Sequence, residues 1–371
     1  MNRLTRIEID GYKSLKHVRL DELGAINVLI GANGVGKSNL FSFFTLLEWM
    51  FRGELQKFIA IQGAASSLFT KGPKVTPRID ARLEFESKEW IRKLRLLLDH
   101  AAPDTAVETI TIDHEQVVSE ARNKKASSKS DFGARRKESV IRPDHRDRDV
   151  REMAGTLSRV RAFHFHDTSM QARVRLAGRV DDNRGLHGDA GNLAAYLHLL
   201  KETKEGYYRR IVDTIRQVYP AFADFDLAPD RLKRELIQLE WRERESDYQL
   251  GPHQLSDGTL RAIGLITLLL QPEEDLPEII LIDEPELGLH PFALDVFASL
   301  VRGVATQRQL FIATQSPALV DLFEPQDIVV AEAGPDGSSF RRLDPERLRT
   351  WLDDFRLSEL WEKNVLGGRP R

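Results

Sequence analysis

The stretch "INVLIGANGVGKSN", residues 26–39, decides the fold class of this chain. Its first five residues are apolar on both faces, as expected for a strand that is covered on both sides in a parallel sheet. A glycine-rich turn, "GANGVGKS", follows at 31–38, and then a helix whose apolar residues recur at helical spacing from Leu40 to Met50. A strand, a glycine-rich loop and a helix in this order predict a phosphate-binding loop.

The residue types of the loop suit this chemistry. Glycines let backbone N–H groups turn inward around a phosphate, and the following helix N-terminus adds partial positive charge. We expect Lys37 to reach the β- and γ-phosphates and the Ser38 hydroxyl to bind Mg²⁺. The alternative, a glycine-rich turn that binds nothing, is disfavoured by the strand and helix on either side. The predicted nucleotide-binding residues are Gly31, Ala32, Asn33, Gly34, Val35, Gly36, Lys37, Ser38 and Asn39.

A second stretch, "LIDEPELGLHP" at 281–291, ends an apolar strand on adjacent carboxylates. Neighbouring carboxylates repel each other, so a cation must lie there or one of them must work as a base. Mg²⁺ supplies the cation: Asp283 would hold the metal through its water shell, and Glu284 would deprotonate the attacking water. The alternative is a helix-capping acid beside a solvated acid.

A third stretch, "LSDG" at 255–258, opens a helix about twenty-five residues before these carboxylates. A Ser–x–Gly turn at a helix N-terminus is itself an anion site, and we predict Ser256 and Gly258 as nucleotide contacts. Alone, this turn would be a plain helix cap about as often. Its place between the other two motifs favours a nucleotide role.

The chain resembles ABC-type ATPase heads of the RecF/SMC/OLD class, and in particular compact stand-alone bacterial ATPases without a coiled-coil arm. The resemblance is carried by "INVLIGANGVGKSNL", "LSDGTLR", "LIDEPELGLHP" and "FIATQSPALVDLF", with weaker matches at "FHFHDTS" and "LWEKNVLGG". It implies ATP and Mg²⁺ as cofactors. It also implies a homodimer in which the signature turn of one subunit closes over ATP bound by the other, with 288–291 at the dimer interface.

The resemblance assigns two glutamines. Gln315 stands where many relatives have a histidine that contacts the γ-phosphate; the amide can donate a hydrogen bond but cannot carry a proton, so fast turnover is in doubt. Gln62, in "IQGAA", is the candidate for the glutamine that completes the metal site, with a polar loop residue as the alternative. The predicted catalytic residues are Glu284, Lys37 and Gln315, and the predicted metal ligands are Ser38, Asp283 and Gln62. Lys13, in "GYKSL", is a further candidate for a nucleotide contact.

Composition narrows the class of protein. The 371 residues carry a net charge of −3. This charge excludes a protein that binds a polyanion along its whole surface, but it allows a local basic patch. No cysteine is present, so disulfides, thiolate catalysis and zinc–thiolate sites are excluded. The N-terminus lacks the apolar segment of a signal peptide, and the longest apolar run is too short to span a bilayer. We expect a cytoplasmic protein that is not associated with a membrane.

Alternating helices and strands in the last third predict an α/β fold with a parallel core sheet. We expect one ABC-type head over 1–371, with an N-terminal lobe at 1–120 that carries an antiparallel sheet, a polar basic insertion at 121–157, a helical middle region at 158–250 and a C-terminal lobe at 251–371. The basic run at 121–152 includes Lys124, Lys125, Arg135 and Arg136 and is read as a solvated loop, with a nucleic-acid backbone as its candidate partner. His164 and His166 are read as structural histidines.

The sequence therefore predicts an ATPase that dimerises head to head around ATP and acts on DNA or on an effector protein such as a nuclease, in DNA repair or anti-phage defence. A non-hydrolysing nucleotide sensor and the ATPase subunit of a membrane transporter remain alternatives. The transporter is disfavoured because more than two hundred residues separate the phosphate loop from "LSDG". A small-molecule kinase is disfavoured as well, because its mechanism does not require the "LSDG" motif.

Overall fold

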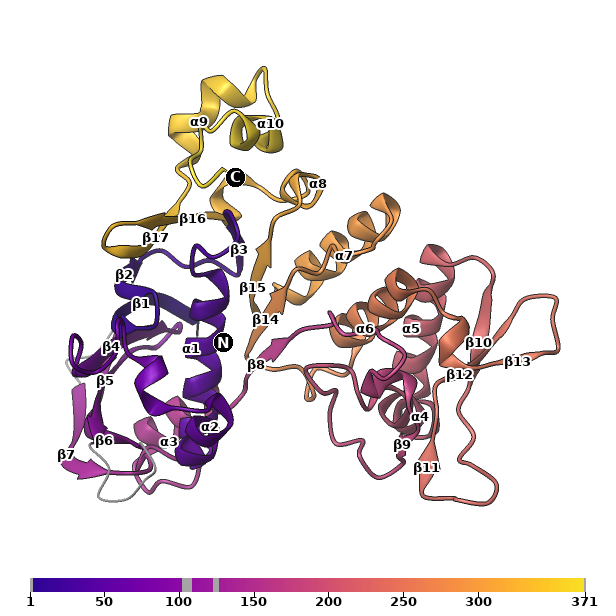
Figure 1. Cartoon of the computed structure of the whole chain (residues 1–371), viewed down its shortest axis with the longest axis horizontal. Coiled ribbons are helices and arrows are strands. Elements are labelled where there is room, and N and C mark those ends of the chain that lie inside the picture. The colour runs from indigo at the N-terminus through magenta and orange to yellow at the C-terminus, as the bar shows by residue number, and fades with distance from the viewer. Residues whose placement is uncertain (1–2, 102–108, 123–126, 370–371) are drawn as a thin grey trace. The chain divides into compact units, whose positions relative to one another are not determined.

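The computed structural model describes residues 3–101, 109–122 and 127–369. These residues form two compact units, which are described separately. The first contains Met1–Arg161, Pro277–Leu281 and Gln307–Arg371, and the second contains Ala162–Leu276 and Ile282–Thr306. Lys124 and Lys125 of the basic run lie outside the described residues. Figure 1 shows the elements in chain order.

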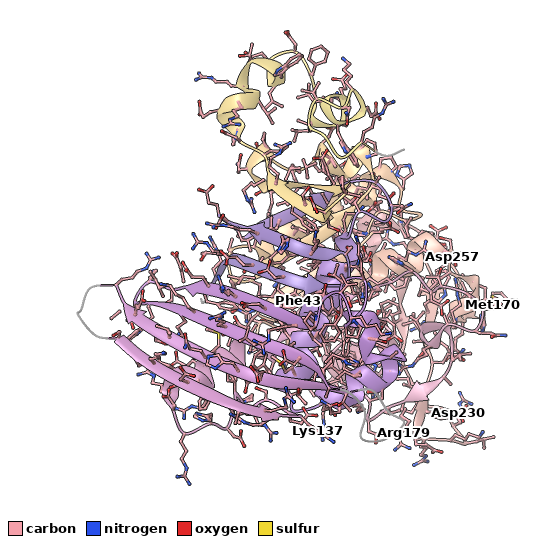
Figure 2. All side chains as sticks on the ribbon, turned by 60° about the vertical axis from the view of Figure 1, so that its left-hand side comes forward. Phe43, Lys137, Met170, Arg179, Asp230 and Asp257 are labelled. Atoms are coloured by element: carbon pink, nitrogen blue, oxygen red, sulfur yellow. The ribbon has the colours of Figure 1, made fainter. Side chains whose placement is uncertain are left out.

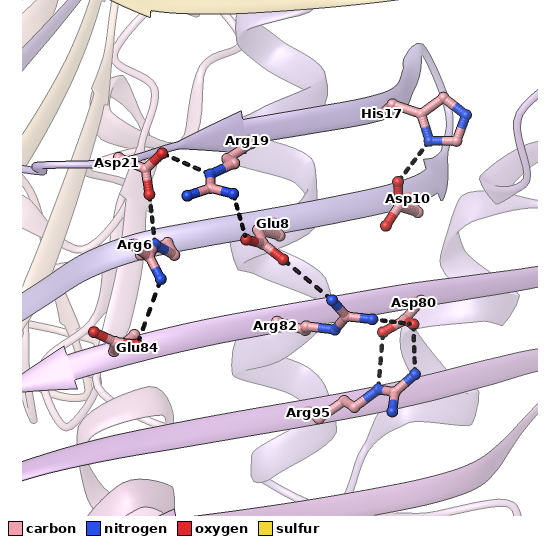
Figure 3. A network of polar contacts seen from close by, with 10 residues as sticks. All are labelled: Arg6, Glu8, Asp10, His17, Arg19, Asp21, Asp80, Arg82, Glu84 and Arg95. Atoms are coloured by element: carbon pink, nitrogen blue, oxygen red, sulfur yellow. Dashed lines mark hydrogen bonds and ion pairs between the residues drawn. The ribbon is translucent and has the colours of Figure 1, made fainter.

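The first unit contains an antiparallel sheet in the strand order β2-β1-β4-β5-β6-β7. Alternating burial along β1 and β4 places one face toward the core, because successive side chains point to opposite faces. The opposite face carries a lattice of ion pairs from Arg6 to Arg95, in which each arginine is paired with a carboxylate (Figure 3). The strands are β1 Arg3–Tyr12, β2 Leu15–Leu20, β4 Arg78–Glu86, β5 Trp90–Ala101, β6 Thr109–Ala121 and β7 Ser127–Arg136.

A second six-stranded sheet has the order β17-β16-β3-β15-β14-β8. Strand β3 runs parallel to both β15 and β16, and its five residues are all buried, as the two-faced apolar run predicted. The strands are β3 Ile26–Ile30, β8 Val160–Phe163, β14 Ile279–Asp283, β15 Gln309–Thr314, β16 Ile328–Gly334 and β17 Gly337–Arg342. This sheet confirms the predicted α/β class.

Helix α1 (Lys37–Phe51) connects the two sheets of the first unit. Phe43 packs edge-on against Tyr12 of β1, with ring centroids 5.3 Å apart, and Phe44 packs against Phe311 of β15 (Figure 2). The other helices of this unit are α2 Leu55–Gln62, α3 Arg148–Leu157, α8 Pro317–Val320, α9 Pro345–Leu352 and α10 Leu357–Glu362, with 3₁₀ turns η1 Ala65–Leu68 and η4 Pro325–Asp327.

The structure corrects the reading of 121–152 as a solvated loop. Residues 127–136 form β7, the edge strand paired with β6, and Asp147 caps the N-terminus of α3 by accepting from the N–H groups of Asp149 and Val150. No apolar alternation marks this strand because none of its residues is buried, and polar edge strands avoid pairing with other chains.

The second unit contains α4 Leu193–Thr203, α5 Glu205–Val218, α6 Asp257–Leu270 and α7 Pro291–Val304, which are the helices predicted there. Its middle region is not purely helical. Phe222, Phe225 and Trp241 form a buried aromatic cluster where strands β10 and β12 pair. The smaller elements are β9 Gly178–Arg179, β10 Phe222–Asp226, β11 Leu236–Ile237, β12 Glu240–Glu243, β13 Gln249–Leu250, η2 Arg173–Arg175 and η3 Pro252–Gln254. In the described parts of the chain, no helix has both the length and the apolar character needed to cross a membrane.

Candidate nucleotide site

The phosphate-binding loop lies between β3 and α1, as predicted. Gly36 caps α1 with φ 105°, a value that side chains with a Cβ rarely adopt, and an added Cβ would collide with Ser338 Oγ. At Gly34, with φ 76°, an added Cβ would meet no atom within 4 Å. Ser338 therefore packs against the loop at Gly36, whereas the space beside Gly34 is open, so a phosphate could approach the backbone there.

Lys37 is only 6% exposed, and its ammonium group lies over the loop itself. Nζ donates to the carbonyl oxygens of Gly31 (2.6 Å) and Ala32 (3.0 Å). Ser38 is exposed beside it, so its hydroxyl is accessible to a metal ion. A buried ammonium group and an accessible hydroxyl at a helix N-terminus are the donor set that a Mg²⁺-bound triphosphate requires.

Gln315 lies at the loop although 282 positions separate it from Asn33. Its Nε2 donates to Asn33 Oδ1 at 2.6 Å, because the parallel pairing of β15 with β3 brings the carboxyl ends of both strands to one edge. The structure thus brings together Asn33 and Gln315, both predicted as site residues.

Three hydrogen bonds that involve the turn between β1 and β2 were missed by sequence reasoning. Asn39 donates to Ser14 Oγ at 2.8 Å, and Ser14 also bonds to Ser338 Oγ at 2.7 Å. The predicted contact of Asn39 with nucleotide stays a prediction. Lys13 has φ 46° and donates to Ser42 Oγ at 2.7 Å, one turn after Ser38, while burial lowers the pKa of its amine. The turn between β1 and β2 therefore supports the first two turns of α1.

The C-terminal tail supports the other side of the loop. An added Cβ at Gly31 would collide with Ala331 O of β16, and one at Gly368 would lie 2.7 Å from Val330 Cγ1 and 3.7 Å from Gly31 Cα. Gly368 is fixed by its N–H to Glu332 and by its carbonyl, which accepts from Trp361 Nε1 at 3.0 Å. The weak sequence match at "LWEKNVLGG" therefore marks a segment that packs beside the start of the phosphate loop.

Gln62 is not brought to the loop by any hydrogen bond between described residues. It is exposed at the last position of α2, which packs near the C-terminal end of α1 (Figure 1). Its role at the metal stays a prediction.

The predicted carboxylates end β14. Asp283 is partly buried, and its carbonyl accepts from His166 Nε2 at 2.9 Å, while Oδ2 lies 3.8 Å from His164 Nδ1. Glu284 has φ 44°, a left-handed conformation that costs a residue with a Cβ about 1 kcal/mol or more and that recurs at functional sites. This left-handed residue directly follows Asp283, the last residue of β14.

The signature turn, "LSDG" at 255–258, caps the N-terminus of α6. Ser256 is exposed, and its Oγ accepts from Thr259 N at 3.1 Å. Gly258 is packed so closely against Gly288 that an added Cβ would collide with the Gly288 carbonyl. The signature turn and the 288–291 segment, both assigned to the dimer interface by resemblance, therefore touch within one chain. Leu287 and Phe292 beside them are 37% and 49% exposed.

A family model described as "AAA domain, putative AbiEii toxin, Type IV TA system" matches residues 26–321. The chain belongs to this AAA family. The match runs from the phosphate loop through the signature turn and the carboxylates to Gln315, so it covers all of these motifs in one domain.

Solved structures show which fold this AAA domain has. The crystal structure of an Smc head bound to the C-winged helix domain of ScpA matches with a TM-score of 0.61 at 15% identity, over 94% of this chain and 99% of that one. An Smc head with an extended coiled coil, bound to the C-terminal domain of ScpA and derived from Pyrococcus furiosus, matches with a TM-score of 0.58 at 14% identity, over 95% and 99%. No curated protein sequence matches the chain. The AAA domain therefore has the fold of an SMC head, which confirms the predicted fold class.

Proposed function

We propose that the chain binds Mg·ATP at the Gly31–Ser38 loop and hydrolyses it as a head-to-head homodimer. In this proposal, residues 1–371 form a single ATPase head, with the N-terminal lobe at 1–120 and the C-terminal lobe at 251–371. The observation that supports this most is the 2.6 Å bond between Gln315 and Asn33, because it brings the predicted γ-phosphate sensor onto an intact phosphate loop.

Each residue has a role in this mechanism. Backbone N–H groups of the loop and Lys37 would hold the β- and γ-phosphates. Ser38 and Asp283 would hold Mg²⁺, whose positive charge would offset the negative charge that develops on the phosphate oxygens. Glu284 takes a proton from the attacking water as the water oxygen bonds to the γ-phosphorus. The bond from that phosphorus to the bridging oxygen breaks, and ADP and inorganic phosphate leave.

Dimerisation would complete each site. Ser256 and Gly258 lie exposed or partly exposed at the N-terminus of α6, where they could contact ATP held by a second subunit. The ATP-bound dimer would bind DNA or an effector protein such as a nuclease, and it would act in DNA repair or anti-phage defence. A protein partner is supported by the two Smc heads, which were solved with domains of ScpA bound.

The test is the Glu284→Gln substitution. The amide cannot accept the proton of water, so we expect wild-type ATP affinity, hydrolysis slowed at least a hundredfold, and an ATP-dependent dimer that accumulates in light-scattering measurements. Glu286→Gln, two positions on, is the matched control and should keep the wild-type rate.

The same experiment separates the alternatives. Native hydrolysis in Glu284→Gln would remove Glu284 from the role of base. A wild-type protein that binds ATP and dimerises without any turnover would be the non-hydrolysing sensor. An ATPase subunit of a membrane transporter would require copurification with a membrane protein.

A further inference from the structure

The segment 164–168, "HFHDT", follows β8 and is held in place by an arginine of the signature helix. Arg261 of α6 donates through Nε to Phe165 O and through Nη2 to His166 O, both at 2.9 Å. The same Nη2 lies 3.2 Å from Thr168 Oγ1. A planar guanidinium that reaches three acceptors of one segment fixes that backbone more firmly than an ammonium group would.

Arg261 also ties this segment to the signature turn and to the turn after the carboxylates. Nη1 donates to Leu287 O at 3.1 Å, next to Gly288, which is packed against Gly258. Arg175, 3% exposed, adds a second link: Nε donates to Thr168 O and Nη2 to Asp257 Oδ1, at 2.8 and 2.7 Å. Hydrogen bonds from Arg261 and Arg175 therefore tie the 164–168 segment to the N-terminal part of α6.

The 164–168 segment also contacts the end of strand β14, at Asp283. His166 Nε2 donates to the backbone carbonyl of Asp283 at 2.9 Å. That carbonyl belongs to the peptide unit between Asp283 and Glu284, and the planarity of this unit means that a donor on the oxygen also orients the Glu284 nitrogen. Glu284 needs such support because its φ of 44° is unfavourable.

We propose that His166 and Arg261 are positioning residues that connect the signature turn of a subunit to the Asp283–Glu284 peptide of the same subunit. This proposal rests on the proposed function. In a head-to-head dimer, the signature turn contacts the ATP of the other subunit. Through the 164–168 segment, the orientation of Glu284 toward the ATP of its own subunit then depends on the contact between the signature turn of that subunit and the ATP of the other subunit.

The expected effect falls on turnover and not on ATP affinity. His166→Leu removes the donor to Asp283 O, and its kcat should fall about tenfold while KM and the Kd for ATP stay at wild-type values. His166→Gln places an amide N–H at a similar reach and should restore most of kcat. A matched control is His198→Leu on α4, a histidine of the same unit that lies outside this network.

The closing experiment measures these constants together with amide hydrogen exchange of the full-length protein. In His166→Leu, exchange should quicken in peptides that cover 283–290 and also 256–260, which His166 does not touch. His166→Gln and His198→Leu should exchange as the wild type does, and thermal unfolding midpoints check that each variant folds.

Three results would overturn the proposal: wild-type kcat in His166→Leu, equal losses in the Leu and Gln variants, or unchanged exchange at 256–260. If the wild-type protein does not turn over ATP, the proposed function fails, and the exchange measurements alone then decide whether the connection exists.

Discussion

Arg175 Nη2 lies 2.7 Å from Asp257 Oδ1 within the signature turn. Asp257 stands where the signature of ABC-type ATPases commonly has a second glycine. The Arg175 guanidinium is almost fully buried, and it also donates to the carbonyls of Pro252 and Leu255. A buried guanidinium is tolerated only when it has acceptors and an anionic partner, so Asp257 supplies what Arg175 needs to hold the turn.

Lys37→Ala should weaken ATP binding at least a hundredfold, because it removes the ammonium group that lies on the loop and would contact the β- and γ-phosphates. Isothermal titration with ATP measures this affinity. Lys74→Ala, an exposed lysine of the same unit, is the control and should bind normally. Unchanged affinity in Lys37→Ala would remove the phosphate-loop assignment.

Ser256→Arg should spare ATP binding but block turnover and dimerisation, because in the proposed dimer the nucleotide that Ser256 contacts lies in the other subunit. Mixing Ser256→Arg with Lys37→Ala protein should recover part of the activity, since each mixed dimer still contains one complete composite site. Rates measured across mixing ratios give the test, and a fully active Ser256→Arg protein would exclude the head-to-head arrangement.

DNA binding, measured by fluorescence anisotropy at several salt concentrations, should weaken steeply as salt rises if the basic strand β7 and its neighbours contact phosphates. Replacing Arg135 and Arg136 by alanine should then lower the salt slope by about two. Arg82→Ala with Arg95→Ala is the control pair. Both arginines have carboxylates within 3.4 Å on the sheet in Figure 3, whereas the ion pair of Arg135 with Asp99 is longer, at 3.8 Å. A slope that is the same in both pairs would return this segment to a structural role.

Gly368→Ala should weaken ATP binding about tenfold, because its Cβ would press on Val330 and Ala331, and Ala331 contacts Gly31 of the phosphate loop. Gly72→Ala is a close control: Gly72 has φ 80° against 61° for Gly368, but an added Cβ there meets nothing within 4 Å. Both variants carry backbone strain, and only Gly368→Ala should lose affinity. Equal affinities would show that the tail does not support the loop.

Local sequence patterns determined much of the site. The strand–loop–helix around 26–39, the apolar strand that ends in Asp283 and the Ser256 cap each depend on contacts within a few residues, so periodicity and turn chemistry are enough to predict them. The same holds for α4 to α7, whose apolar spacing is helical. Strand β7 was missed because an exposed edge strand has no apolar alternation to read.

The tertiary structure alone decided what surrounds these motifs. Gln315 reaches Asn33, Gly368 packs beside Gly31, and His166 donates to Asp283, across separations of 282, 337 and 117 positions. Such contacts arise where parallel strands end at one edge of a sheet or where a backbone lacks a Cβ, and neither condition leaves a local pattern in the chain. The sequence by itself predicted which groups would bind and hydrolyse ATP, and the fold decided which residues surround those groups, because positioning depends on packing between segments that are distant along the chain.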